Sequence, residues 1–397
     1  MEILRKYRAA KMAFPSKGRR KFAWENKPTG KNVWMAQFES LLWILRISLR
    51  FPFTRTIDGK LRIKLISWPF LYWLVGYCII AAVNAENFFE LFKHMINEKM
   101  SFLELIIAGY NVVIMVYFCT YVGSVFSEFS MLADFLNYWS DVEVTYERGI
   151  GKPMSFKHKR RCDFLASIVL PFSFIIVVLM KDVIYYVHWY SLSVHVVALS
   201  ALITMSEYAV ISNQELMNLN RGIKRKIVTD LCSLGSAIPS ACDIANLRIA
   251  WLHLNVAIKA HFEAWSYVGT NICITLQIVF VTSLFAAISE LLSGKNLPLD
   301  LIVLVVASCN ISFIVFNNGH RLSENAGADI AKALAHVNLL PLETSAREEV
   351  KLFMKVVRIN YRDLTFGGIV ICNRGTITDM VSVTVTYLII LLQLERG

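Results

Sequence analysis

The feature that most constrains this chain is a series of seven long apolar runs. A bilayer crossing takes about twenty mostly apolar residues, and a helix is the usual way to satisfy the backbone of such a run inside the membrane. The stretch 163–211 is too long for one crossing, and Lys181 and Asp182 interrupt it, so it counts as two. The runs are 64–85, 102–125, 163–180, 186–211, 264–289, 301–320 and 376–394. The sequence therefore predicts an all-α membrane protein with seven transmembrane helices.

The composition excludes other classes of protein. Only 18% of the residues are charged, whereas soluble domains are roughly a quarter charged. A net charge of +11 reflects basic cytoplasmic loops in a chain with membrane spans, so no nucleic-acid partner is expected. The eight cysteines show no CxxC and no paired spacing, which argues against a disulfide framework or a metal site. No motif of an enzyme or a cofactor site is present, and we expect neither catalysis nor a cofactor.

The positions of Lys and Arg predict the orientation of the spans. Cytoplasmic loops carry an excess of these residues. One set of alternate segments carries thirty-five of them and the other set five. The basic set comprises 1–63, 126–162, 212–263 and 321–375. We therefore expect a cytoplasmic N-terminus and an extracellular C-terminus, the reverse of a G-protein-coupled receptor.

The last apolar run carries a short motif. Thr386 and Tyr387 are followed by five apolar residues and then by Gln393. This string resembles the closing motif of insect gustatory receptors, which reads TY, five hydrophobic residues and QF, with Leu394 here in place of the final Phe. Seven spans with this polarity and long second and third cytoplasmic loops agree with that family over the whole chain.

The resemblance implies a taste receptor that acts as a ligand-gated, non-selective cation channel in the plasma membrane of a sensory neuron. Four copies, of the same or related subunits, would surround a pore lined by the last helix, and the cytoplasmic parts would pack into a shared anchor. A small-molecule tastant, membrane lipids and permeant cations are the implied partners. Two alternatives stay open: a seven-helix receptor that signals through a cytoplasmic partner, and a secondary transporter.

The resemblance divides the chain into four regions. Residues 1–63 form a cytoplasmic N-terminal region, and 64–320 a six-helix domain that senses the ligand. Residues 321–375 form the anchor helices, and 376–397 the pore-lining seventh span. Leu388 stands where sugar-sensing members typically carry an acidic residue, which leans against a sugar and leaves a bitter compound, carbon dioxide or an internal nutrient as candidate ligands.

One stripe of the seventh span has the chemistry of a pore. Residues spaced i, i+3, i+4 and i+7 share a helix face, and a pore needs an apolar ring that dewets and a polar group that meets the ion. The stripe contains Thr386, Ile389, Ile390, Gln393 and Leu394. Ile390 and Leu394 are the candidate gate and Gln393 the candidate cation contact. No acidic residue lies on these positions. In the alternative interpretation, Gln393 only hydrogen-bonds a neighbouring helix, and Tyr387, off the stripe, packs at an interface.

Aromatic and polar residues in the outer halves of the spans are the candidate ligand site. Small-molecule sites combine apolar walls with a few hydrogen-bonding groups. The candidates are Tyr110, Asn111, His188, Trp189, His195, Gln277 and Phe280. The alternative is an aromatic belt at the membrane interface.

Two further segments predict amphipathic helices. The stretch 36–53 places Arg46 and Arg50 on an otherwise apolar helix, which favours a helix at the inner membrane surface. In 348–362, one face collects apolar residues that must be buried against another helix. That face contains Val350, Phe353, Met354, Val357 and Tyr361.

Overall fold

The computed structural model describes most of the chain. The described residues are 32–49, 51–56, 60–97, 109, 112, 116, 128, 131–179, 191–232, 239–294, 299–361 and 363–396. The predicted second span, 102–125, lies almost entirely outside them, as do residues 1–31 and 186–190.

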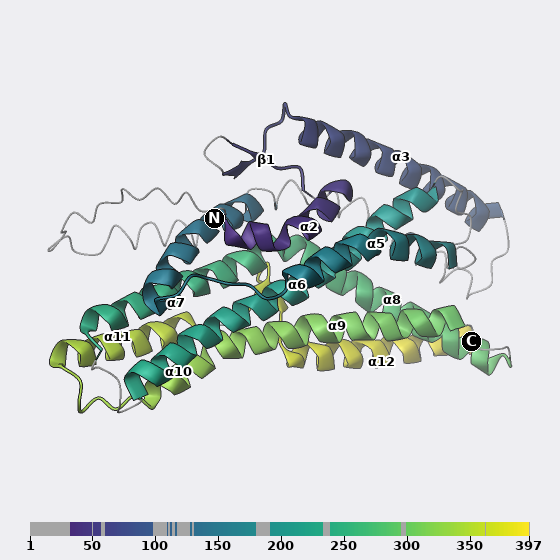
Figure 1. Cartoon of the computed structure of the whole chain (residues 1–397). Coiled ribbons are helices and arrows are strands. Elements are labelled where there is room, and N and C mark those ends of the chain that lie inside the picture. Colours follow the sequence, from purple (N-terminus) through teal and green to yellow (C-terminus); the bar gives the residue numbers. More distant parts are fainter. Residues whose placement is uncertain are drawn as a thin grey trace.

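The described part is built from helices, with two short antiparallel hairpins (Figure 1). The helices are α2 (Val33–Ile47), α3 (Trp68–Asn97), α5 (Lys159–Leu179), α6 (Ser191–Ile227), a π-helical turn η1 (Val228–Cys232), α7 (Ala241–Ala264), α8 (Ser266–Leu292), α9 (Leu299–Ala326), α10 (Ala328–Ala335), α11 (Thr344–Asn360) and α12 (Arg374–Arg396). Residues 131–150 are also helical. The hairpins pair β1 (Thr54–Arg55) with β2 (Leu61–Arg62) and β3 (Thr365–Phe366) with β4 (Val370–Ile371).

The predicted spans correspond to helices wherever the structure describes them. Four helical segments of the described residues are long and apolar enough to cross a membrane: Trp68–Lys93, Ser266–Leu292, Leu301–Ala335 and Arg374–Leu394. The predicted spans 163–180 and 186–211 fall on α5 and α6. Several helices extend well beyond the apolar runs, and the extensions of α6 and α9 pack against further helices of the chain.

Large apolar side chains are exposed along α3 and α5. Such an exposed apolar surface is unusual for a soluble monomer and suits contact with lipid. Examples are Leu71, Val75, Ile79, Phe89 and Phe92 of α3 and Phe164, Phe172, Phe174 and Ile175 of α5.

One end of the molecule gathers α7, α10 and α11 with the C-terminal parts of α6 and α9 (Figure 1). We call this part the anchor. Trp251 of α7 is fully buried and donates its indole N–H to the carbonyl oxygen of Ala326, 2.9 Å away. Arg248 of α7 pairs with Glu349 of α11, with 2.5 Å between Nε and Oε1. These contacts join three helices that are distant in the sequence.

The predicted face of α11 is confirmed in this anchor. Val350, Phe353 and Val357 are buried and Met354 is half-buried. Tyr361, the fifth predicted residue, lies just past the end of α11. Its ring packs on Gly327, in the break between α9 and α10, but is 42% exposed. The face within α11 is therefore covered by other helices of the same chain.

The amphipathic helix predicted over 36–53 differs from the structure in its bounds and in what covers its apolar face, and its place at the membrane surface stays a prediction. The helix α2 begins at Val33 and ends at Ile47, and its apolar face packs on α5 and α6. Trp34 and Phe38 are fully buried, and the Trp34 indole donates to the Tyr208 hydroxyl, 3.2 Å away. The apolar faces of neighbouring helices cover α2, which leaves little of its apolar face for lipid. Arg50 lies outside the described residues.

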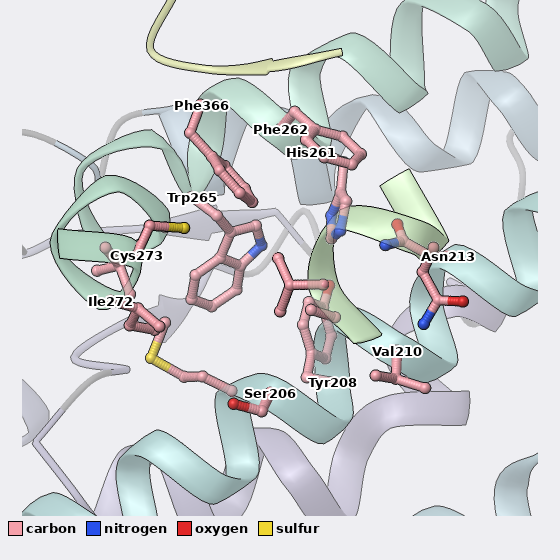
Figure 2. A pocket seen from close by; sticks show the side chains of 16 residues that line it. Ser206, Tyr208, Val210, Asn213, His261, Phe262, Trp265, Ile272, Cys273 and Phe366 are labelled. Carbon is pink, nitrogen blue, oxygen red and sulfur yellow. The ribbon is translucent and has the colours of Figure 1, made fainter. Parts of the chain in front are cut away.

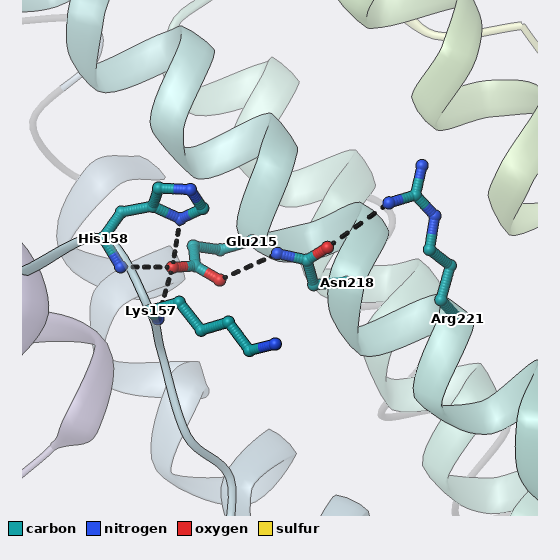
Figure 3. A network of polar contacts seen from close by, with 5 residues as sticks. All are labelled: Lys157, His158, Glu215, Asn218 and Arg221. Carbon is teal, nitrogen blue, oxygen red and sulfur yellow. Dashed lines mark hydrogen bonds and ion pairs between the residues drawn. The ribbon is translucent and has the colours of Figure 1, made fainter.

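A buried carboxylate fixes the segment before α5 to α6 (Figure 3). Glu215 is 1% exposed. Its Oε1 accepts the backbone N–H groups of Lys157 and His158, at 2.8 and 3.1 Å, and lies 2.7 Å from Nδ1 of His158. Its Oε2 accepts from the Asn218 amide at 3.4 Å. These donors compensate for the removal of the carboxylate from water.

Replacing Glu215 with Ala should lower the free energy of unfolding by about 3 kcal/mol. Hydrogen bonds to charged groups contribute about 1.5–3 kcal/mol each, and the buried backbone donors would lose their acceptor. Denaturant unfolding of the purified chain in detergent measures the change.

Glu207→Ala is the matched control on the same helix. Glu207 pairs with Arg161 at 2.9 Å, but the two side chains are 29% and 42% exposed. Exposed pairs contribute about 0–1 kcal/mol. Equal losses in the two variants would show that the buried network is no stronger than a surface pair.

Candidate functional site

The last helix, α12, packs with one face only. It lies along α8 and α9 (Figure 1). The packed side chains recur at helical spacing and are Ile377, Met380, Thr384, Leu388 and Leu391. Thr384 is the most deeply buried of them, at 2% exposure. Successive residues turn by about 100° in an α-helix, so this set defines a single side of α12.

The predicted pore stripe lies on the opposite side of α12. All five of its residues are exposed: Thr386, Ile389, Ile390, Gln393 and Leu394. Ile390 is 44% and Leu394 61% exposed. The structure therefore brings these residues together on one uncovered apolar face, and their role in a pore remains a prediction. Tyr387 is also exposed and lies beside the stripe, so it could contact a neighbouring subunit.

The stripe continues toward the N-terminal end of α12 to an acidic residue that sequence reasoning missed. Asp379 precedes Thr386 by seven residues, which is close to two full turns of the helix. Its side chain is exposed. The spacing of seven residues between Asp379 and Thr386 is the sequence signal that places both on one face.

Gln277, a predicted ligand residue, joins α8 to α12. Its Nε2 donates to the Thr384 hydroxyl at 2.7 Å and to the Met380 carbonyl oxygen at 3.0 Å. Thr384 in turn donates to the Met380 carbonyl oxygen at 2.8 Å. In this structure the amide nitrogen of Gln277 is therefore engaged by the last helix.

The other predicted ligand residues are only partly within the described structure. Phe280 is half-buried on α8, close to one turn after Gln277. Tyr110, Asn111, His188 and Trp189 lie outside the described residues, and so does the side chain of His195. A ligand site among them remains a prediction.

A cavity that contains none of these residues lies where the anchor meets the membrane helices (Figure 2). Its walls come from α6, α7, α8, α9 and β3, and they include Tyr208, His261 and Trp265. Sequence reasoning did not find it, because its residues belong to segments up to about 160 positions apart.

Residues 40–395 match the profile described as 7tm chemosensory receptor. The chain belongs to this family. The receptor is 23% identical to gustatory and odorant receptor 24 of Anopheles gambiae over 89% of this chain and 76% of that protein. It is 24% identical to gustatory and odorant receptor 22 of the same species, over 67% of this chain and 57% of that protein.

Solved structures show the same fold. The receptor superposes on the insect olfactory receptor OR5 from Machilis hrabei with a TM-score of 0.64, over 92% of this chain and 100% of that one, at 12% identity. The complex of OR5 with eugenol gives a TM-score of 0.61 at 13% identity, with the same coverage. At this identity the likeness concerns the fold. The all-α, seven-span architecture predicted from the apolar runs is confirmed, and the receptor is a multi-pass membrane protein.

A double-mutant cycle should show that Gln277 and Thr384 act as a pair. Gln277→Leu and Thr384→Val each remove one partner of the same hydrogen bond. Their effects on the free energy of unfolding should therefore fall short of additivity by about 0.6 kcal/mol, the average for interhelical hydrogen bonds in membranes, and by no more than about 1.7 kcal/mol. Unfolding of the purified receptor in detergent measures the coupling.

Thr386→Val is the matched control for this cycle. The Thr386 hydroxyl donates to the Ser382 carbonyl oxygen of its own helix, 3.0 Å away. Gln277→Leu and Thr386→Val should therefore be additive. Additivity in both cycles would mean that Gln277 does not hold α12.

Proposed function

We propose that the receptor is a chemosensory ligand-gated cation channel whose pore is lined by α12. The observation that carries this proposal is the one-sided packing of that helix. A mostly apolar face with one amide and one carboxylate is left bare along its length. Water-filled pores are lined by such a combination of apolar constrictions and polar rings. The relatives named as gustatory and odorant receptors support a chemosensory role.

Assembly of four copies, of the same or related subunits, would enclose the bare stripe. Placed around one axis, four α12 helices would bring four copies of each stripe residue close together. Ile390 and Leu394 would form apolar rings that dewet in the closed state. The Gln393 amides would meet hydrated cations, and Asp379 would place four carboxylates nearer the anchor. Weak amide contacts and solvated carboxylates suit a non-selective cation pathway.

The activating ligand is a small-molecule tastant or odorant. An olfactory receptor of the same fold has been solved with eugenol, which supports a small organic ligand for this receptor. Tyr110, Asn111, His188, Trp189, His195 and Phe280 remain the proposed contacts in the outer halves of the spans. The receptor would act in the plasma membrane of a sensory neuron, in contact with lipids along α3 and α5.

The N-terminus is proposed to be cytoplasmic and the C-terminus extracellular. The motivation is the thirty-five to five division of Lys and Arg between alternate segments. An epitope tag after Gly397 should be labelled by antibody on intact cells. A tag before Met1 should be labelled only after permeabilisation, and the reverse pattern would place the anchor outside the cell.

Charge at Gln393 should change conduction in opposite directions. Gln393→Arg should lower the cation current about tenfold or more, since each 1.4 kcal/mol of added barrier reduces a rate about tenfold. Gln393→Glu should raise divalent permeability, and Ile390→Ser should raise the current without ligand by weakening the dewetting barrier. Recording from cells with matched surface expression, with permeability ratios from reversal potentials, measures these effects.

Because the Arg and Glu variants alter the same position, each is the control for the other. Loss of folding would lower the current of both variants. At a pore position, by contrast, the Arg variant should lower the cation current and the Glu variant should raise the divalent permeability. Asp379→Asn should lower the single-channel conductance. Identical conduction in the parent, the Arg variant and the Glu variant would show that α12 does not line the pore.

A further inference from the structure

The cavity between the anchor and the membrane helices has mostly apolar walls with a few polar side chains among them (Figure 2). About 670 Å³ of space lies between these walls, part of it open to solvent. Tyr208 and Asn213 of α6 line it, with His261 and Trp265 at the junction of α7 and α8, Cys273 of α8 and Phe366 of β3. Among the described residues that line it there is no Asp, Glu, Lys or Arg. The site therefore suits an uncharged molecule.

Three buried polar atoms of this lining have no hydrogen-bond partner in the described structure. They are Nδ1 of His261, Oδ1 of Asn213 and Nε1 of Trp265. The three residues are 3%, 5% and 8% exposed, respectively. An unpaired buried polar group costs about 1–3 kcal/mol, and native proteins leave few of them. Three around one cavity indicate a bound group that supplies the missing partners.

The hydrogen bonds around His261 identify which partner is missing. Ser212 donates its hydroxyl proton to the Ala209 carbonyl oxygen, 3.1 Å away. With the Ser212 proton assigned to that bond, the Ser212 oxygen accepts from the His261 Nε2–H, which lies 3.1 Å away. His261 precedes the span of α8, and burial lowers the pKa of its imidazole to about 3. The ring is thus neutral, and its Nδ1 offers a bare lone pair.

The wall offers both a donor and an acceptor. His261 and Trp265 are four residues apart, at the end of α7 and just after it, and the ring of Tyr208 packs against both. The Trp265 indole N–H is a donor only, and the His261 Nδ1 is an acceptor. A hydroxyl group can accept from the first or donate to the second.

We propose that this cavity binds a small, uncharged, mostly apolar molecule that carries one hydroxyl group. The hydroxyl donates to His261 Nδ1 or Asn213 Oδ1 and accepts from Trp265, while the apolar body fills the space beside Tyr208, Cys273 and Phe366. Water alone would satisfy the polar atoms but would leave the apolar walls uncovered. The site is separate from the outer ligand residues Tyr110, His188 and Trp189.

The cavity adjoins the segment that leads into α12. The ring of Phe366 packs closely on Gly269 and stacks on Phe262, with 5.4 Å between ring centroids. The turn after Phe366 uses Gly367 and Gly368 at φ of +59° and +75°, a conformation that favours glycine, and β4 then leads into α12. A molecule in the cavity would bias the position of α12. The resulting change in current rests on the proposed channel function.

Binding is tested on the purified full chain with a diazirine derivative of benzyl alcohol and mass spectrometry. We expect labels on cavity residues, and free benzyl alcohol should compete with them. Ethylbenzene, in which a methyl group replaces the hydroxyl, should compete about tenfold less well. His261→Phe removes the acceptor and should bring the two competitors to within about twofold of each other.

Two variants complete the test. His253→Phe is the matched control on α7, because the His253 ring stacks on Tyr138 outside the cavity, and it should leave the alcohol preference intact. Ala209→Leu fills the cavity and should remove the labels. Labels spread over the lipid-facing side of α3, or none in the cavity, would overturn the site and leave water as its occupant. An alcohol preference unchanged in His261→Phe would overturn the assigned hydrogen bond. Binding with no change in ligand-free current would overturn only the coupling to α12.

Discussion

Two helices of this receptor, α6 and α9, are long enough to lie partly in the membrane and partly in water. The helix α6 has 37 residues, which corresponds to about 55 Å, against about 30 Å for the hydrocarbon core of a bilayer. Its first part is apolar, and its last turn carries Lys224, Arg225 and Lys226. The helix α9 likewise continues past its apolar run to Ala326. The anchor exists because these continuations leave the membrane and require helical partners outside it.

The junction between the two environments concentrates the polar chemistry of the described structure. Glu215 accepts the backbone donors that precede α5, and His261, Asn213 and Trp265 surround the cavity one layer away. Among the membrane helices, the side chain of Gln277 donates a hydrogen bond to Thr384 of the last helix. Glu215 and Gln277 are thus paired within the chain, whereas His261, Asn213 and Trp265 border a space that another molecule can fill.

The one-sided packing of α12 is the feature of the structure from which the proposed function follows. A helix whose bare face were meant for lipid would have no use for the amide of Gln393 or the carboxylate of Asp379 on that face. Ionisable groups are costly in lipid and are found where they face water or a partner. The opposite face, held by Gln277 and Thr384, fixes the orientation of the bare stripe.

The sequence by itself determined where the membrane helices lie in the chain, since the bilayer leaves the backbone of a long apolar run few alternatives to a helix. It did not determine where they end, and α6 continues to Ile227, well past its apolar run. It also determined the buried face of α11 and the shared stripe of Ile390 and Gln393, because helical spacing is a local property. Only the tertiary structure decided that α2 is covered by α5 and α6 rather than by lipid, and that Gln277 bonds Thr384. The tertiary structure likewise decided where the cavity lies, since His261, Asn213 and Phe366 meet through packing between distant segments. Apolar surfaces on helices do not specify their partners, so local patterns carry no information about such contacts.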